Sequence, residues 1–191
     1  MKSWVVGMLS LFVGSPAPAS APTPTPTPSS TPTPSSPPAP APDPENRSLP
    51  PLTSPDLDEC ARHLFDAVVS GHPELALDFF FPREPFIPLK DVADPGRYHD
   101  ELVRTYRRDI ASLHGSRRSW ENATFEKFEL GTKPTWVAPG REWNKIGYFR
   151  TLDGRLTYTV AGKRRQLAVR TIISWQGRWY VTHLRPFHPK G

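Results

Sequence analysis

The hydrophobic pattern of residues 55–71 is that of an amphipathic helix, because its apolar positions recur every three or four residues. Ser54 precedes the pattern and can cap the helix, while Pro55 occupies the first helical position. Gly71 ends the pattern, as glycine commonly does at a helix C-terminus. The sequence therefore predicts a helix that begins at Pro55 and ends near Gly71.

A second helical pattern runs from Tyr98 to Leu113 and predicts the longest helix of the chain. Between the two helices, a shorter helix is expected from Pro73 onward, and it ends in three adjacent phenylalanines at 79–81. A lone helix cannot bury three adjacent aromatic rings, so this segment should lie wedged between other elements. Residues 82–95 are punctuated by prolines and are expected to form a loop.

Beyond residue 114 apolar and polar positions alternate and glycine-containing turns recur, which indicates β-strands. Short turns at Asp153-Gly154, Gly162-Lys163 and Gln176-Gly177 would join neighbouring strands into antiparallel hairpins. Helices first and an antiparallel sheet second predict an α+β fold, with the N-terminal helices packed on one face of a curved, cone-like sheet. The expected strands are residues 123–130, 145–152, 155–160, 165–175 and 178–184.

Hairpin turns fix which residues lie opposite each other, and opposite residues share a face of the sheet. With the turns above, the face toward the helices collects apolar and hydroxyl side chains and contains neither a carboxylate nor a histidine. Such a lining suits an apolar ligand with a few polar groups, although the same side chains could simply fill a core. The candidate ligand-binding residues on this inner face are Tyr158, Thr171, Trp175, Tyr180 and Thr182.

The opposite face of the sheet is mixed, with large apolar side chains beside arginine and histidine. A surface of this kind is too apolar for open solvent, so it is expected to dock a partner protein or to form a homodimer. The candidate partner residues on this outer face are Arg150, Arg170, Ile172, Trp179 and His183.

The first 19 residues match the three zones of a secretory signal peptide. Lys2 precedes an apolar run at residues 4–13, and small residues follow up to Ala17-Pro18-Ala19. The apolar run is too short to span a bilayer, which takes about 20 residues. We therefore expect a protein exported to the periplasm or outside the cell, in contact with a membrane only if the signal peptide stays uncleaved.

Residues 20–54 are expected to be a disordered linker, because 16 of the 25 prolines lie between Pro16 and Pro55, among Thr, Ser and Ala. Such a segment is extended and would tether the folded domain, residues 55–185, at a distance from its anchor. Residues 186–191 would form a short tail. Asn46-Arg47-Ser48 in the linker also fits the N-glycosylation triplet.

Charge and single residue types disfavour several classes of function. The net charge is +5, but basic and acidic side chains alternate along the helix at 98–113, so no nucleic-acid interface is expected. Cys60 is the only cysteine, and its position near the apolar stripe of the first helix predicts a buried thiol rather than a nucleophile. The histidines lack the paired spacing of zinc sites, and no phosphate-binding glycine loop or nucleophile elbow is present. The sequence therefore assigns no metal, no cofactor and no catalytic residue.

Two motifs stand near the ends of the folded part. The first is the break Gly71-His72-Pro73-Glu74-Leu75-Ala76 after the opening helix, and the second is the closing hairpin at 172–183 with Gly177-Arg178-Trp179-Tyr180-Val181. In this order they resemble the nuclear-transport-factor-2-like superfamily, the cystatin-like α+β cone that includes the SnoaL-like domains, over residues 56–184. The resemblance implies a conical pocket between sheet and helices and frequent dimerisation. It leaves function open, because this superfamily contains both enzymes and non-catalytic binding domains.

Three functions are compatible with the sequence. The leading interpretation is an exported, non-catalytic binding or accessory domain that holds a small apolar ligand in a conical pocket. The second is an acid/base enzyme of the isomerase or dehydratase type, with His183 beside Arg170, or with Asp109 and Lys90 from the helical layer. The third is an envelope protein whose patch around Trp179 and Arg170 docks a partner protein.

Overall fold

The computed structural model of the protein describes residues 43–186 and shows an α+β fold. Within these residues the helices are α1 (Pro55–Ser70), the short 3-10 helix η1 (Pro73–Ala76), α2 (Arg83–Leu89) and α3 (Pro95–Gly115). The strands are β1 (Thr124–Glu129), β2 (Thr135–Val137), β3 (Tyr148–Val160), β4 (Lys163–Trp175) and β5 (Arg178–His183). The expected signal peptide, most of the expected linker and residues 187–191 lie outside the described residues.

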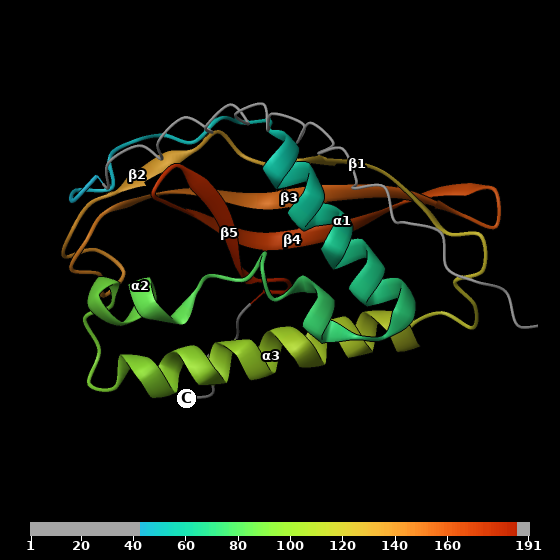
Figure 1. Cartoon of the computed structure of the whole chain (residues 1–191), viewed down its shortest axis with the longest axis horizontal. Helices are drawn as coiled ribbons and strands as arrows, with labels where there is room; N and C mark the ends of the chain where they lie inside the picture. The colour runs from blue at the N-terminus through green and yellow to red at the C-terminus, as the bar shows by residue number, and fades with distance from the viewer. Residues whose placement is uncertain (1–42, 187–191) are drawn as a thin grey trace, which may run out of the picture. The chain divides into compact units, whose positions relative to one another are not determined.

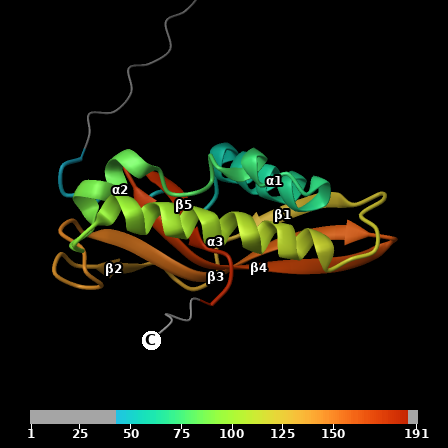
Figure 2. The same ribbon diagram turned by 90° about the horizontal axis from the view of Figure 1, so that it is seen from below.

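The strands form one antiparallel sheet in the order β1-β3-β4-β5, and β2 pairs with the first residues of β3. The long strands β3 and β4 are the centre of this sheet. Figure 1 and Figure 2 show α3 running along the length of the β3–β4 hairpin, with α1 on the same side. The predicted fold class is therefore confirmed, whereas β2 has no counterpart among the expected strands.

The two long helices begin at the caps that their sequences provide. The Ser54 hydroxyl accepts a hydrogen bond from the Leu57 backbone N–H at 3.1 Å, and Gly71 closes α1 in the left-handed conformation with φ of 75°. At the start of α3, the Asp94 carboxylate accepts a hydrogen bond from the Arg97 backbone N–H at 2.9 Å. Both helices predicted from the apolar spacing are confirmed.

The segment 82–95 contains the helix α2, where the sequence predicts a loop. Pro85 lies in the first turn of α2, where the backbone N–H would have no acceptor within the helix, so its missing hydrogen costs nothing. Pro88 removes one internal hydrogen bond, and the buried side chains of Phe86 and Leu89 hold the helix against the domain instead. The prolines therefore do not prevent a short helix here, and the expectation of a loop is wrong for residues 83–89.

The helix expected from Pro73 to the phenylalanines at 79–81 is shorter, because only Pro73–Ala76 is helical. The three phenylalanines are wedged against the edge of the sheet, as expected. Phe79, Phe80 and Phe81 are all buried. The Phe81 N–H donates a hydrogen bond to the Val181 carbonyl at 3.0 Å, and the Val181 N–H donates one to the Phe79 carbonyl at 2.8 Å. This segment therefore covers part of the exposed edge of β5, a common way to protect an edge strand.

The predicted turn at Asp153-Gly154 is wrong, because β3 is a single strand that passes through both residues. Asp153 adopts a left-handed φ of 58°, yet the pairing with β4 continues on either side of it. A Cβ atom at Gly154 would lie 2.8 Å from the Ile172 Cδ1 atom and 3.0 Å from the Phe128 Cζ atom. This glycine therefore serves a close tertiary contact rather than a turn.

The other two hairpin turns exist. The turn at Gln176-Gly177 lies where it is predicted, and both residues have positive φ, as two-residue turns of type I′ require. The tip of the β3–β4 hairpin is Ala161-Gly162, one residue earlier than the predicted turn.

The folded domain includes residues that the sequence assigns to the linker. Asn46 is fully buried, and its amide Nδ2 donates hydrogen bonds to the carbonyls of Gly147 at 3.0 Å and Ser174 at 3.1 Å. Its Oδ1 atom accepts a hydrogen bond from the Gln176 N–H at 2.8 Å. Because the Asn46 amide is fully engaged inside the fold, the triplet at 46–48 is not an accessible glycosylation site in this structure.

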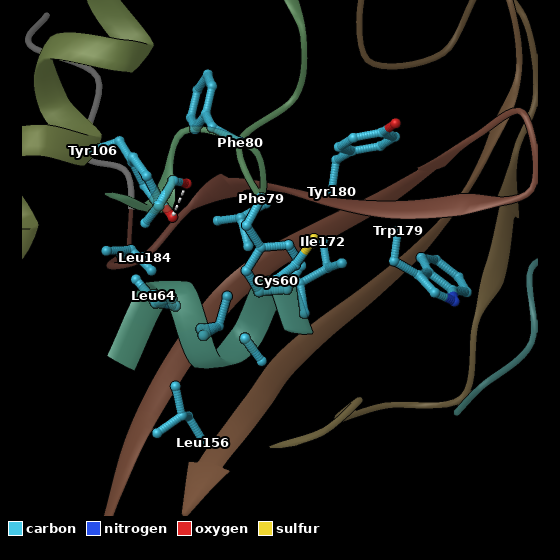
Figure 3. Close-up of a cluster of buried hydrophobic side chains, with 14 of the residues drawn as sticks. Cys60, Leu64, Phe79, Phe80, Tyr106, Leu156, Ile172, Trp179, Tyr180 and Leu184 are labelled. Atoms are coloured by element: carbon cyan, nitrogen blue, oxygen red, sulfur yellow. Dashed lines mark hydrogen bonds between the residues drawn. The ribbon is translucent and has the colours of Figure 1, made fainter. Parts of the chain in front are cut away.

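The hydrophobic core lies between α1, the 79–81 segment and the sheet. Figure 3 shows Cys60 of α1 close to Phe79 and to Ile172 of β4, with Leu64 of α1 in the same cluster of buried side chains. Cys60 is buried, as its position in the sequence predicts. Burial, with the nearby carboxylate of Asp78, raises the pKa of the Cys60 thiol to about 11, so this thiol is a core side chain and a poor nucleophile.

Candidate functional site

A cavity of about 760 Å³ opens at the end of the domain that holds α2. It lies between α2, the first half of α3, the loop at 138–147 and the adjoining parts of β3, β4 and β5. The volume falls within the range of small-molecule sites, and the lining is predominantly apolar with a few polar groups, as such sites require. The polar groups include Lys90, Glu142, Tyr148, Thr171, Thr182 and His183.

His183 reaches the cavity because β5 contains a β-bulge. Val181 lies opposite Ile172 of β4, but His183 lies opposite Thr171, so Thr182 is an extra residue in the pairing. Both Thr182 and His183 line the cavity. The expectation that the inner side of the sheet lacks a histidine, with His183 on the outer face, is therefore wrong, because strict alternation along the strand cannot anticipate a bulge.

Burial sets the charge of the His183 imidazole. Its Nδ1 atom lies 3.0 Å from the Thr182 hydroxyl oxygen. Desolvation, with a smaller contribution from the positive charge of Lys90, lowers the pKa of His183 to about 4. The imidazole is therefore neutral at neutral pH.

Lys90 brings the positive charge into the cavity from the end of α2. Its backbone N–H caps the helix by donating to the Phe86 carbonyl at 3.1 Å. Its ammonium lies 5.9 Å from the centre of the Phe86 ring and 6.0 Å from the centre of the Tyr148 ring. Burial lowers the pKa of Lys90 to about 8, and the carboxylate of Glu142 opposes this shift.

The loop at 138–147 closes one side of the cavity and is tied to the end of α2. The Asp91 N–H donates to the Trp143 carbonyl at 2.7 Å, and the Lys145 N–H donates to the Leu89 carbonyl at 2.8 Å. Glu142 and Trp143 both have positive φ, at 53° and 54°. The Trp143 side chain lines the cavity and is 76% exposed, so it stands at the mouth.

The same loop places Glu142 against Tyr148 and Arg150 of β3. The Tyr148 hydroxyl donates a hydrogen bond to the Glu142 carboxylate at 2.9 Å, and the Arg150 guanidinium forms an ion pair with it. The Asn144 amide in turn donates to the Tyr148 hydroxyl oxygen at 2.9 Å. Burial and the neighbouring Glu142 raise the pKa of Tyr148, so its hydroxyl stays protonated and acts as a donor.

The candidate ligand-binding residues divide between the cavity and the core. Thr171 and Thr182 line the cavity. Tyr158 is buried elsewhere, where its hydroxyl accepts a hydrogen bond from the Arg117 guanidinium at 3.1 Å. Trp175 and Tyr180 pack edge-on against the Phe81 ring.

The candidate partner residues do not form one outer surface. Ile172 is fully buried, and Trp179 is buried with its indole N–H donating to the Pro51 carbonyl at 2.9 Å. Arg150 lies opposite Ile173 and pairs with Glu142, and Arg170 pairs with Asp153 at 2.5 Å. At Trp179, a contact with the chain's own Pro51 takes the place of the expected partner protein.

Of the groups considered for acid/base chemistry, Lys90 and His183 line the same cavity. Thr171, not Arg170, lies opposite His183 in the sheet. Asp109 of α3 is half-buried and lies outside the cavity lining; burial raises its pKa, and Arg185 and Arg108 oppose that shift. Glu142 and Trp143 were missed by the sequence analysis, because the loop that holds them has no hydrophobic periodicity.

Residues 43–186 contain no group of three or more His, Cys, Asp or Glu side chains placed to hold a metal ion. In the same part of the chain, no helix combines the length and the apolar character needed to cross a bilayer. No protein-family model, curated protein or solved structure matches this chain.

Proposed function

We propose that this domain is a non-catalytic binding domain that holds a small, largely apolar molecule in the cavity at α2. The observation that carries the proposal is the cavity's size, about 760 Å³, together with a lining in which side chains such as Phe86, Leu102 and Ile173 surround a few polar groups. The resemblance to the nuclear-transport-factor-2-like superfamily supports it, because such domains hold ligands between sheet and helices.

Binding is better supported than acid/base catalysis. His183 is the side chain best placed to act as a base, since it lines the cavity and is neutral at neutral pH. A base whose pKa is about 4 is weak at neutral pH, whereas an effective catalytic base has a pKa near the operating pH. His183 is therefore not assigned a catalytic role.

Display outside the cytoplasm on a proline-rich tether is part of the same proposal, and it rests on the sequence of residues 1–42 alone. We do not propose a homodimer through the outer sheet face, because the side chains of Trp179 and Ile172 are buried within one chain and are not available to a second copy. Mass spectrometry of protein secreted by an expressing cell tests export: the N-terminus should follow Ala19, and an intact Met1 on protein retained in the cytoplasm would contradict it.

The binding proposal is tested with N-phenyl-1-naphthylamine, an uncharged apolar dye whose fluorescence rises in apolar sites. We expect saturable binding of one dye per chain. Ala93→Trp, at an exposed position of the cavity lining, should block binding, while Ala111→Trp, at an exposed position of α3 outside the lining, should not. Absent or unsaturable binding, or equal binding by both variants, would overturn the proposal.

A further inference from the structure

Each carboxylate around the cavity is already compensated by other groups of the protein. Glu142 pairs with Arg150 and accepts from the Tyr148 hydroxyl. Asp91 pairs with Lys145 at 3.7 Å. Asp94 accepts the backbone N–H that starts α3, where the helix dipole also favours a negative charge. These carboxylates therefore have their charge balanced without the help of Lys90.

The Lys90 ammonium is a cavity cation that no carboxylate of the described residues contacts directly. Within residues 43–186 it forms no ion pair, and its hydrogen bond is to the backbone carbonyl of Glu142, at 3.4 Å. The aromatic rings of Phe86 and Tyr148 flank it. They attract the cation, but they also keep water away from it. The Glu142 carboxylate favours the charged form of Lys90 but is paired with Arg150 and makes no direct ion pair with the ammonium. A half-buried ammonium without a carboxylate in direct contact is costly unless another group supplies the negative charge.

The rest of the lining shows where the apolar part of a ligand would lie. Leu102 and Ile173 line the same cavity as Lys90, and the Trp143 ring stands at its mouth. The Thr171 hydroxyl lies in the same lining, and His183 adds no competing positive charge, since its imidazole is neutral at neutral pH. The cavity therefore combines one unpaired positive charge with an apolar chamber.

We propose that the molecule held in this cavity is an amphiphile with a single negatively charged head group, such as a carboxylate, which forms an ion pair with Lys90, while its apolar body lies against Leu102 and Ile173. This inference rests on the proposed binding function and narrows it to one class of ligand. An uncharged analogue loses the ion pair, and a positively charged one is repelled by Lys90.

The test uses the full chain and three probes with the same ten-carbon body: decanoate and decylammonium below their micelle concentrations, and decanol below its solubility limit. Their affinities are measured by displacement of N-phenyl-1-naphthylamine at pH 7. We expect decanoate to bind about tenfold more tightly than decanol, and decylammonium to bind more weakly than both. Equal affinities for decanoate and decanol would overturn the inference while leaving the binding function intact. If no probe and no dye binds, the binding function itself fails.

Lys90→Met keeps an unbranched side chain, shorter by one heavy atom, and removes its charge. It should weaken decanoate binding about tenfold and leave decanol binding unchanged, whereas Lys133→Met, at an exposed lysine outside the cavity, should change neither. If Lys90→Met binds decanoate as tightly as the unaltered protein does, the ion pair does not exist.

The pH dependence of decanoate binding to the unaltered protein tests the same ion pair without any substitution. The pKa values of Tyr98 and Tyr148 lie above the usual range of tyrosine, and the pKa of His183 is lowered to about 4. Lys90, with a pKa of about 8, is therefore the cavity group that loses its charge just above neutral pH. Decanoate affinity should therefore fall as the pH rises from 7 to 10, while decanol affinity stays constant. The fall should be centred somewhat above pH 8, because a bound anion raises the pKa of the ammonium with which it pairs. A decanoate affinity independent of pH over this range would contradict the proposal.

Discussion

His183 lies directly opposite Thr171 across the β4–β5 hairpin, although Val181, two residues before it, lies opposite Ile172. The extra residue, Thr182, turns the imidazole toward the cavity at the end of α2. One residue of register thus decides whether this histidine belongs to a site or to the outer face of the sheet.

The burial of His183 should make the stability of the protein depend on pH. The pKa of the imidazole is about 4 in the folded protein and about 6.5 in the unfolded chain, so between these values the unfolded chain binds the extra proton. The free energy of unfolding should therefore fall as the pH decreases from 6.5 to 4, and this group should contribute no further change outside that window. We expect a loss of about 1 to 3 kcal/mol from this residue.

Urea unfolding of the unaltered protein and of His183→Gln, at pH 7 and at pH 4.5, measures this contribution. The variant should lose less stability on acidification, because glutamine does not titrate. Parallel pH profiles for the two proteins would show that His183 titrates normally in the fold.

Cys60 should react slowly with alkylating reagents in the folded protein. Its thiol is buried and its pKa is raised to about 11, so the reactive thiolate is scarce at pH 8. We expect iodoacetamide to label it roughly a hundredfold more slowly than a cysteine in an unfolded peptide. Urea should restore fast labelling.

Asp78→Asn removes a negative charge that raises this pKa, so it should speed labelling of the folded protein. Complete labelling of the native protein within minutes would show an accessible thiol.

The elements that the sequence predicts well are those whose signals are local. Ser54 and Gly71 bound α1 as expected, because a cap depends on its own backbone and on residues within one turn. The turn at Gln176-Gly177 is equally local. The failures occur where a distant contact overrides such a signal: Asp153-Gly154 reads as a turn but lies within β3, where Gly154 makes room for Phe128 and Ile172.

The candidate site is harder to predict for the same reason. Thr171 and Thr182 could be chosen from alternation, because hydroxyl side chains on an inner face are visible in the sequence. Lys90, Glu142 and His183 meet only through the packing of the α2 end, an irregular loop and a bulge. None of these three features has a periodic pattern from which a position could be derived.

Gly154→Ala tests the close contact inside β3. The added Cβ atom would lie 2.8 Å from Ile172 Cδ1, and Ile172 is fully buried, so neighbours must shift. We expect a loss of about 1 to 3 kcal/mol in the free energy of unfolding. Gly115→Ala is the control, because a Cβ there meets nothing within 4 Å.

The Ile172→Val change removes the Cδ1 atom and should relieve part of that overlap. Alone it costs about 1 kcal/mol, as for other buried isoleucines. The double variant should lose less free energy of unfolding than the sum of the losses of the two single variants, because the two positions share one contact. Additive losses, measured by urea unfolding, would place Gly154 away from Ile172.

Asn46→Ala tests whether the domain begins before α1. The substitution leaves the carbonyls of Gly147 and Ser174 and the N–H of Gln176 without the side-chain partner that each has now. Buried polar groups that lose their partners are expensive, so we expect the free energy of unfolding to fall by about 2 to 4 kcal/mol. Glu45→Ala, at an exposed neighbouring position, should change it by less than about 0.5 kcal/mol. If both variants unfold at the same urea concentration as the unaltered protein, residues 43–54 do not stabilise the fold, and the domain begins at Pro55.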